Sequence, residues 1–310
     1  MPKNDRPMAM SETVQSPALP AWRDYYEMCK PRVVLLMLLC TLVGMFLATS
    51  AWVSVSLIVN CLLGVALVAG SAAALNHLID ASVDQKMART ENRPVAQGRV
   101  TTVQGLIFVG ITGALGLAIL AITVNPLTAW LNFFSWLGYG LIYTLYLKRA
   151  TSQNIVIGGL FGAAPPLFGW TAVTNSIDGG GLLLVLIIFA WTPPHFWALA
   201  IDRLEEYKKV DIPMLPITHG VAYTKLHIVL YTILLIITSV LPFVIGMSNV
   251  FYLVSALALG AGFLYWSLMM FWDRSPDAPI ETFKYSILYL ALLFLALLID
   301  HYMMPVTYAQ

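Results

Sequence analysis

Long apolar runs separated by short polar segments are the feature that most constrains how this chain can fold. Roughly 20 helical residues cross the hydrocarbon of a membrane, about 30 Å thick, so each run is long enough to span it. Backbone groups in lipid need internal partners, and the runs lack the alternation of barrel strands, so we expect helices. The predicted spans are residues 33–50, 54–75, 102–123, 127–147, 154–173, 182–201, 226–246, 250–271 and 285–304.

Composition agrees with this reading, since 59% of the 310 residues are hydrophobic and only 11% are charged. Such values lie outside the range of soluble domains. We therefore predict an all-α polytopic membrane protein with nine transmembrane helices. Residues 1–21 are predicted to be a disordered cytoplasmic tail, and residues 22–310 a single transmembrane domain. The three cysteines suggest neither a disulfide framework nor a metal cluster.

The basic residues orient the predicted spans. All 17 Lys and Arg residues precede the first span or follow an even-numbered one. By the positive-inside rule, this distribution predicts a cytoplasmic N-terminus and an external C-terminus. We separately expect the membrane to be a bacterial inner (plasma) membrane. The net charge of +1 gives no indication of a nucleic-acid partner.

A polar motif follows the second span without a break. Asn76, Asp80 and Asp84 are spaced four residues apart, so on a helix they share one narrow stripe. They form either a solvated helix end or a functional site. We favour a functional site, because acidic residues at the edge of the hydrocarbon are usually functional. Two carboxylates at this spacing suit Mg²⁺, which takes one or two carboxylates together with substrate phosphate oxygens.

Three basic residues follow in the same segment: Lys86, Arg89 and Arg93. A guanidinium fork matches phosphate oxygens, so the arginines are candidates to hold a diphosphate. The alternative is ordinary charge on the cytoplasmic side.

A second acidic cluster follows the sixth span and repeats the four-residue spacing between Asp202 and Glu206, with Glu205 and Asp211 nearby. Because both clusters follow even-numbered spans, the chain is predicted to contain two related four-helix halves plus a ninth helix. Two acidic faces could bracket a diphosphate through two Mg²⁺ ions. The alternative is a solvated loop of mixed charge.

These segments resemble the UbiA-type intramembrane aromatic prenyltransferases, and more narrowly the branch of that family that farnesylates heme b. The resemblance rests on "NHLIDASVDQKMARTENRP" together with five further segments in family order: "KPRVVLL", "YTLYLKRATSQN", "GAAPPLFGW", "WTPPHFWALAI" and "IPMLPITHG". The sequence departs from the pattern at Glu206, where an aspartate is expected. Which acids of the second cluster bind metal therefore stays open.

The resemblance implies that farnesyl diphosphate is ionised and that its C1 joins a vinyl group of heme b, with addition of water, to give heme O. Asp80 and Asp84 would hold one Mg²⁺, and Asp202, Glu206 and Asp211 another. Lys86, Arg89 and Arg93 would neutralise the diphosphate. Substrate contacts are further expected from Asn76, Lys148, Arg149 and Lys208. Membrane lipid and a downstream heme A synthase or terminal oxidase are the other expected partners.

Two histidines bear on the acceptor. His195 follows Pro193 and Pro194 inside the sixth span, and His77 lies in the first motif. Either could ligate heme iron or bind a propionate, although a lone histidine on an apolar helix is often structural. We favour His195, because the prolines free backbone groups beside it.

Three other functions remain as alternatives. A prenyltransferase could act on another aromatic acceptor, such as a quinone precursor or chlorophyllide. A secondary transporter would place its acids near the midplane rather than at helix ends. A structural heme-binding subunit would explain the histidines but not the paired acids.

Overall fold

The computed structural model describes residues 20–87, 90–209 and 212–303. Within these ranges the secondary structure is helical, and no strand occurs. The prediction of an all-α protein is therefore confirmed. Most of the predicted tail lies outside the described residues, so its disorder and the domain boundary at residue 22 stay predictions.

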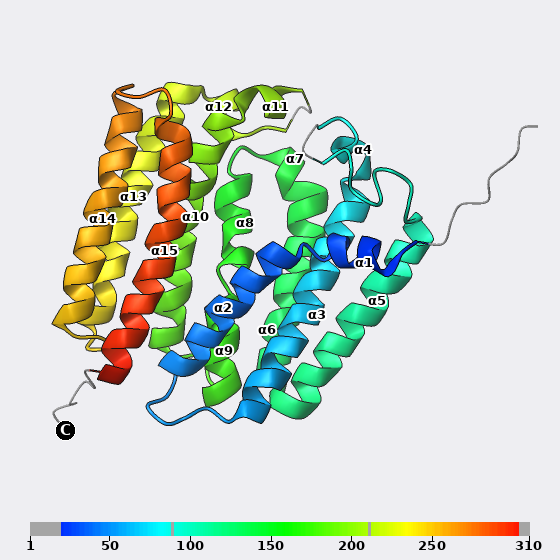
Figure 1. Ribbon diagram of the computed structural model, residues 1–310, viewed down its shortest axis with the longest axis horizontal. Coiled ribbons are helices and arrows are strands. Elements are labelled where there is room, and N and C mark those ends of the chain that lie inside the picture. Colours follow the sequence, from blue (N-terminus) through cyan, green and yellow to red (C-terminus); the bar gives the residue numbers. More distant parts are fainter. Residues whose placement is uncertain (1–19, 88–89, 210–211, 304–310) are drawn as a thin grey trace, which may run out of the picture.

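The helices follow one another with short connections (Figure 1). Their bounds are α1 Trp22–Met28, α2 Pro31–Leu47, α3 Val55–Ile79, α4 Ala81–Asp84, α5 Thr102–Ile119, η1 Leu120–Val124, α6 Pro126–Trp136, η2 Leu137–Leu147, α7 Lys148–Ala150, α8 Asn154–Gly162, α9 Pro165–Thr174, α10 Gly179–Asp202, α11 Leu204–Lys208, α12 Leu215–Thr218, α13 Val221–Val244, α14 Val250–Phe271 and α15 Ala278–Met303.

Several helices begin at residues whose side chains satisfy free backbone amides. The Ser54 hydroxyl accepts from the amide of Leu57 at the start of α3. Thr101 forms a capping box with Gln104 at the start of α5, and Asn125 precedes Pro126 at the start of α6. These caps, and a proline in the first turn, fix the residues at which the apolar helices begin.

All nine predicted spans overlap helical stretches, but their number is not confirmed. Seven helices in the described part of the chain are long and apolar enough to cross a membrane, or eight if α1 and α2, bent by 55°, count as one span. The continuous stretch Pro126–Leu147, which covers the fourth predicted span, is not among them. Its Trp, Tyr and Asn side chains make it less apolar. The division into two related halves stays a prediction.

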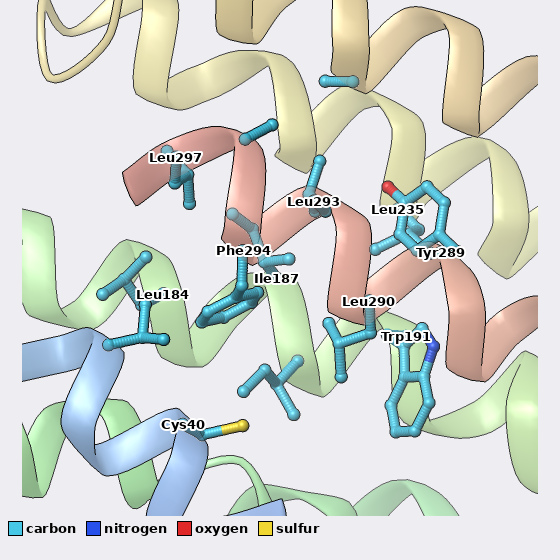
Figure 2. Close-up of a cluster of buried hydrophobic side chains, with 14 of the residues drawn as sticks. Cys40, Leu184, Ile187, Trp191, Leu235, Tyr289, Leu290, Leu293, Phe294 and Leu297 are labelled. Atoms are coloured by element: carbon cyan, nitrogen blue, oxygen red, sulfur yellow. The ribbon is translucent and has the colours of Figure 1, made fainter. Parts of the chain in front are cut away.

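The longer helices pack side by side (Figure 1). Helices α10, α13, α14 and α15 pack against one another, while α3 packs on α5 and α2 on α9. The largest buried cluster joins α2, α10 and α15, and Figure 2 shows Trp191, Leu290 and Cys40 from these three helices within it. The Trp191 indole also donates a hydrogen bond of 2.7 Å to the carbonyl of Ser286. These contacts fix the walls of the cavity described below.

The short helices α4, α7 and α11 lie at the same end of the bundle, along the upper edge of Figure 1. They carry or adjoin both acidic clusters. The loops after α3, η2, α10 and α14 open at this end, and they hold most of the described Lys and Arg residues. One end of the bundle therefore holds most of the charged side chains.

Candidate active site

The first acidic motif spans the junction of α3 and α4. Helix α3 ends at Ile79, yet the Asp80 amide donates to the Asn76 carbonyl at 3.0 Å and the Asp84 amide to the Asp80 carbonyl at 2.8 Å. The four-residue hydrogen bonding continues across the junction, so the spacing inferred from the sequence is kept. Asn76, Asp80 and Asp84 are all buried.

Asp80 is at the centre of this group. Its Oδ2 accepts hydrogen bonds from the Asn76 amide at 2.8 Å and from the Lys148 ammonium at 2.6 Å. Its Oδ1 is buried without a hydrogen-bond partner among the described residues, and the nearest guanidinium nitrogen of Arg149 is 4.0 Å from it. A buried carboxylate oxygen that is left unpaired is costly, and a cation would satisfy it.

Lys30 adds a second cation to the group. It adopts a left-handed backbone conformation between α1 and α2, and its ammonium donates to the Asn76 side-chain oxygen. Asn76 therefore links two lysines through Asp80, since its amide nitrogen bonds that carboxylate. The resulting chain of Lys30, Asn76, Asp80 and Lys148 draws on three separate segments of the sequence.

Asp84 is paired with Arg93. One guanidinium nitrogen lies 2.8 Å and 2.7 Å from the two carboxylate oxygens. The segment between them is held by the Thr90 hydroxyl, which donates to the Asp84 carbonyl at 3.1 Å. Lys86 is exposed and forms no ion pair with the described residues, and Arg89 lies outside them.

The donor set of the first motif fits a hard divalent cation. Within residues 20–87, 90–209 and 212–303, no three His, Cys, Asp or Glu side chains group closely enough to hold a metal by themselves. Mg²⁺ does not need such a group, because it binds through one or two carboxylates plus phosphate oxygens and water. The unpartnered Oδ1 of Asp80 meets that requirement, and Asp84 lies one helical turn away.

The second acidic cluster is paired locally. Arg203 lies 3.1 Å from Asp202 and 3.0 Å from Glu206, while Lys208 lies 2.7 Å from the more exposed Glu205. The pKa of Arg203 is raised, first by its hydrogen bond to Glu206 and then by the charge of Asp202. In the described chain, no hydrogen bond or ion pair joins these residues to Asp80 or Asp84. Asp211 lies outside that part, so a second metal site stays a prediction.

An apolar cavity of about 470 Å³ begins beside this polar group. Lys30 lines its charged end, and Tyr139 and Tyr143 line one wall with ring centroids 5.5 Å apart. Both tyrosines lie on η2, an 11-residue π-helix, which is an unusual element often found at functional sites. Val33 and Phe196 line the cavity while remaining exposed on the helix surface, so the cavity communicates with the surrounding lipid.

His195 lies in the cavity wall and His77 does not. The His195 ring stacks on Trp191 and Phe283, at centroid distances of 4.1 and 4.6 Å. Its Nδ1 lies 2.6 Å from the Ser286 hydroxyl. His77 is buried in α3, and both of its ring nitrogens lack a partner among the described residues.

The structure thus brings together Asn76, Asp80, Lys148 and Arg149, and separately Asp84 and Arg93. Lys208 pairs outward with Glu205 and contacts neither group. Sequence reasoning assigned no role to Lys30, Tyr139 or Tyr143. Lys30 had a visible signal, since it is a lone lysine directly before the proline that starts an apolar span. Tyr143 opens one of the segments that carry the family resemblance, but aromatic residues in a span usually fill the core or the interface, so nothing marked either tyrosine as part of a site.

Comparison with known proteins agrees with this arrangement. Residues 37–298 match the UbiA prenyltransferase family. The chain is 61% identical to a protoheme IX farnesyltransferase of Teredinibacter turnerae, over 93% of each chain. It is 57% identical to the protein of the same name from Hahella chejuensis, over 96% of this chain and 99% of that one.

Solved structures with the same fold are more distant in sequence. One, described as a digeranylgeranylglyceryl phosphate synthase, has a TM-score of 0.77 at 17% identity and covers 91% of this chain and 99% of its own. Another is a UbiA homologue from Archaeoglobus fulgidus bound to GPP and Mg²⁺, with a TM-score of 0.64 at 16% identity, covering 88% and 99%. From its sequence match and its fold, this integral membrane chain belongs to the UbiA prenyltransferase family.

Proposed function

We propose that this protein transfers the farnesyl group of farnesyl diphosphate to a vinyl group of heme b, with addition of water, giving heme O and diphosphate. The names of its relatives, at 57–61% identity over nearly the whole chain, support this choice of substrates. The reaction needs a polar site for the diphosphate next to an apolar site for the prenyl chain.

One observation carries the proposal. One oxygen of the buried Asp80 carboxylate accepts hydrogen bonds from Asn76 and Lys148, and the other oxygen has no partner among the described residues. Asn76 also connects this carboxylate to Lys30, which lines the charged end of the apolar cavity. Asp80 can therefore ligate a cation without giving up its existing contacts. Asp80 and Asp84 would hold Mg²⁺, which would neutralise oxygens of the leaving diphosphate.

The basic side chains favour departure of the diphosphate. When the bond from C1 to oxygen breaks, its electron pair stays on the diphosphate and an allylic cation remains. Lys148, Arg149 and Arg93 surround the two aspartates, so positive charge already faces the place where negative charge grows. Such prearranged charge is usually the largest catalytic contribution.

The cavity walls suit the cation that remains. The faces of Tyr139 and Tyr143 can stabilise positive charge, and the apolar lining excludes water that would quench it. The vinyl π electrons of heme b then form the new bond to C1. Water adds its oxygen to the resulting benzylic cation and loses a proton, which completes the balance of atoms and charge.

His195 is the side chain that we propose contacts the heme. The Ser286 hydroxyl donates its hydrogen to the Phe283 carbonyl at 2.6 Å, so its oxygen accepts from the Nδ1–H of His195. This hydrogen bond leaves the Nε2 of a neutral ring unprotonated, in a side chain that lines the cavity. An unprotonated Nε2 is the form of imidazole that ligates iron. His77, which has no partner, stays a candidate for a propionate.

The proposal includes the orientation of the bundle in the membrane. The charged end of the bundle would face the cytoplasm of a bacterial inner membrane, with the N-terminus on that side. Product would leave through the lipid toward a heme A synthase or a terminal oxidase.

Incubating the purified protein with heme b, farnesyl diphosphate and Mg²⁺ tests the function. We expect a more hydrophobic heme, identified by chromatography and mass, and no product after chelation of the metal. Parallel reactions with a quinone precursor and with chlorophyllide test whether another aromatic molecule accepts the prenyl group. Prenylation of one of these but not of heme b would reject the proposal.

A further inference from the structure

The cavity has a defined depth, because it runs along one face of α2 and then stops. Its α2 lining begins with Arg32, Val33 and Val34 and continues through Leu36, Met37 and Cys40, and these last three lie on one side of that helix. Lys30 marks its charged end. No residue of α2 beyond Cys40 lines it.

Helices α2 and α9 meet directly past Cys40. A Cβ added to Gly169 would lie 1.8 Å from the Thr41 carbonyl oxygen, and one added to Gly44 would lie 2.0 Å from the Pro166 carbonyl oxygen. The two backbones are therefore in contact and leave no space between them. A chain entering from Lys30 cannot continue between these helices.

Larger side chains close the α3 and α9 sides at the same depth. Phe168 of α9 lines the cavity and is only 2% exposed, and Val68 of α3 lines it beside Phe168. Both pack into a buried cluster with Met45 and Val65, on the far side from the acidic motif. Nearer that motif, the α3 residues along the wall are the small Ala69, Ala72 and Ala73. The cavity is thus open along its length and blocked at its end.

The depth matches one prenyl chain. Ten residues separate Lys30 from Cys40 on α2, which at about 1.5 Å per residue gives roughly 15 Å. A farnesyl chain has twelve carbons in its backbone, joined by bonds of about 1.5 Å, and is roughly 14 Å long when extended. One further isoprene unit would exceed the depth, and one fewer would leave the end empty.

We propose that Cys40, Val68 and Phe168 form a floor that sets the prenyl chain at three isoprene units. This inference rests on the proposed function for its substrate class, a prenyl diphosphate, and extends it to the residues that select chain length. Binding can test it without the heme acceptor.

The test uses the full-length protein in detergent with Mg²⁺. Affinities are measured by calorimetry for the geranyl, farnesyl and geranylgeranyl S-thiolodiphosphates, which are not hydrolysed. We expect the native protein to bind the farnesyl analogue about tenfold or more tightly than the geranylgeranyl analogue, as fitted pockets discriminate even single methylenes. Phe168→Ala should bring the two affinities within about threefold.

Two further variants sharpen the result. Cys40→Leu adds volume to the floor and should move the preference toward the geranyl analogue, an effect that loss of packing at Phe168 cannot mimic. Phe196→Ala is the matched control, because Phe196 lines the cavity at its lipid-exposed side and not at the floor. The ratio of farnesyl to geranylgeranyl affinity should stay native in that control.

Equal binding of the farnesyl and geranylgeranyl analogues by the native protein would contradict the proposed floor. Unchanged ratios of affinity in both Phe168→Ala and Cys40→Leu would contradict it as well. If the variants change the preference for chain length as predicted but no prenylated heme forms, the floor is supported and heme b is rejected as the acceptor.

Discussion

Lys148 and Asp80, 68 residues apart in the chain, form an ion pair of 2.6 Å in which the Asp80 side chain is only 3% exposed. The pair joins the end of the π-helix η2 to the end of α3. A buried carboxylate needs such a partner, because an isolated charge at this depth is costly. The same ammonium can face a diphosphate bound beside Asp80.

Lys148→Ala should therefore weaken substrate binding. We expect KM for farnesyl diphosphate to rise about tenfold or more, since a charge-assisted contact contributes roughly 1.5–3 kcal/mol. Lys148→Arg should recover part of the loss. Steady-state kinetics with varied farnesyl diphosphate measure the effect. Lys284→Ala, which removes an exposed lysine, is the control, and a native KM in Lys148→Ala would contradict the role.

Asp80→Asn keeps the shape of the side chain and removes its charge. Product formation should fall on the order of 10²- to 10³-fold, the usual cost of losing one such stabilising group. Rates are followed by chromatography of the hemes, and circular dichroism checks that the helices remain. Glu281→Gln changes a partly exposed acid that pairs only with Lys284 in the described chain, and it should retain activity. Equal losses in both variants would mean that Asp80 has no special role.

Ser286→Ala tests how His195 is oriented. Without the hydroxyl, Nδ1 loses its partner and the ring can protonate at either nitrogen. Removing the group that orients a ligating histidine costs about 10- to 100-fold in affinity. We expect that loss in a heme titration followed by absorption, with a shifted spectrum. Ser239→Ala removes a buried hydroxyl bonded to Tyr289, outside the cavity lining, and should leave the spectrum unchanged. A native titration in Ser286→Ala would exclude iron ligation positioned this way.

The first motif shows how far sequence could predict the site. Spacing of four residues placed Asn76 next to Asp80, because helix geometry is local, and the structure has their side chains 2.8 Å apart. Spacing could not place Lys30 or Lys148, which reach the same group from 46 and 68 residues away. Such contacts depend on how the helices pack.

The same limit applies to the fold and the cavity. Apolar runs predicted all the long helices, since hydrophobic length is a property of each segment. They could not reveal that α1 and α2 are bent by 55° or that η2 is a π-helix. Phe168 and Val68 read as ordinary core residues in the sequence. They line a cavity only because small residues elsewhere leave space beside them.

Asp300→Ala should reduce stability without affecting the chemistry. Asp300 is fully buried in α15 and accepts hydrogen bonds from the Asn249 and Tyr252 amides at 2.6 and 3.1 Å, at the start of α14. Loss of a cap and of its buried partner costs about 1–2 kcal/mol. Thermal unfolding in detergent should show a lower midpoint, with kcat of the remaining folded protein unchanged. Glu91→Ala, at an exposed site outside the helices, is the control, and an unshifted midpoint in Asp300→Ala would disprove the cap.

Gly44→Ala and Gly110→Ala should act in opposite directions, although both replace a glycine inside a helix. The Cβ of the first would lie 2.0 Å from the backbone oxygen of Pro166, which cannot move aside as a flexible side chain would. Forcing α2 and α9 apart should cost about 1–3 kcal/mol or more. At Gly110 nothing lies within 4 Å, so alanine should stabilise α5 by about 0.5–1 kcal/mol through its better helix propensity. Unfolding midpoints measured in one detergent compare the pair. Similar shifts for both would mean that the backbones of α2 and α9 are not in contact, and the closed end of the cavity would be lost with that contact.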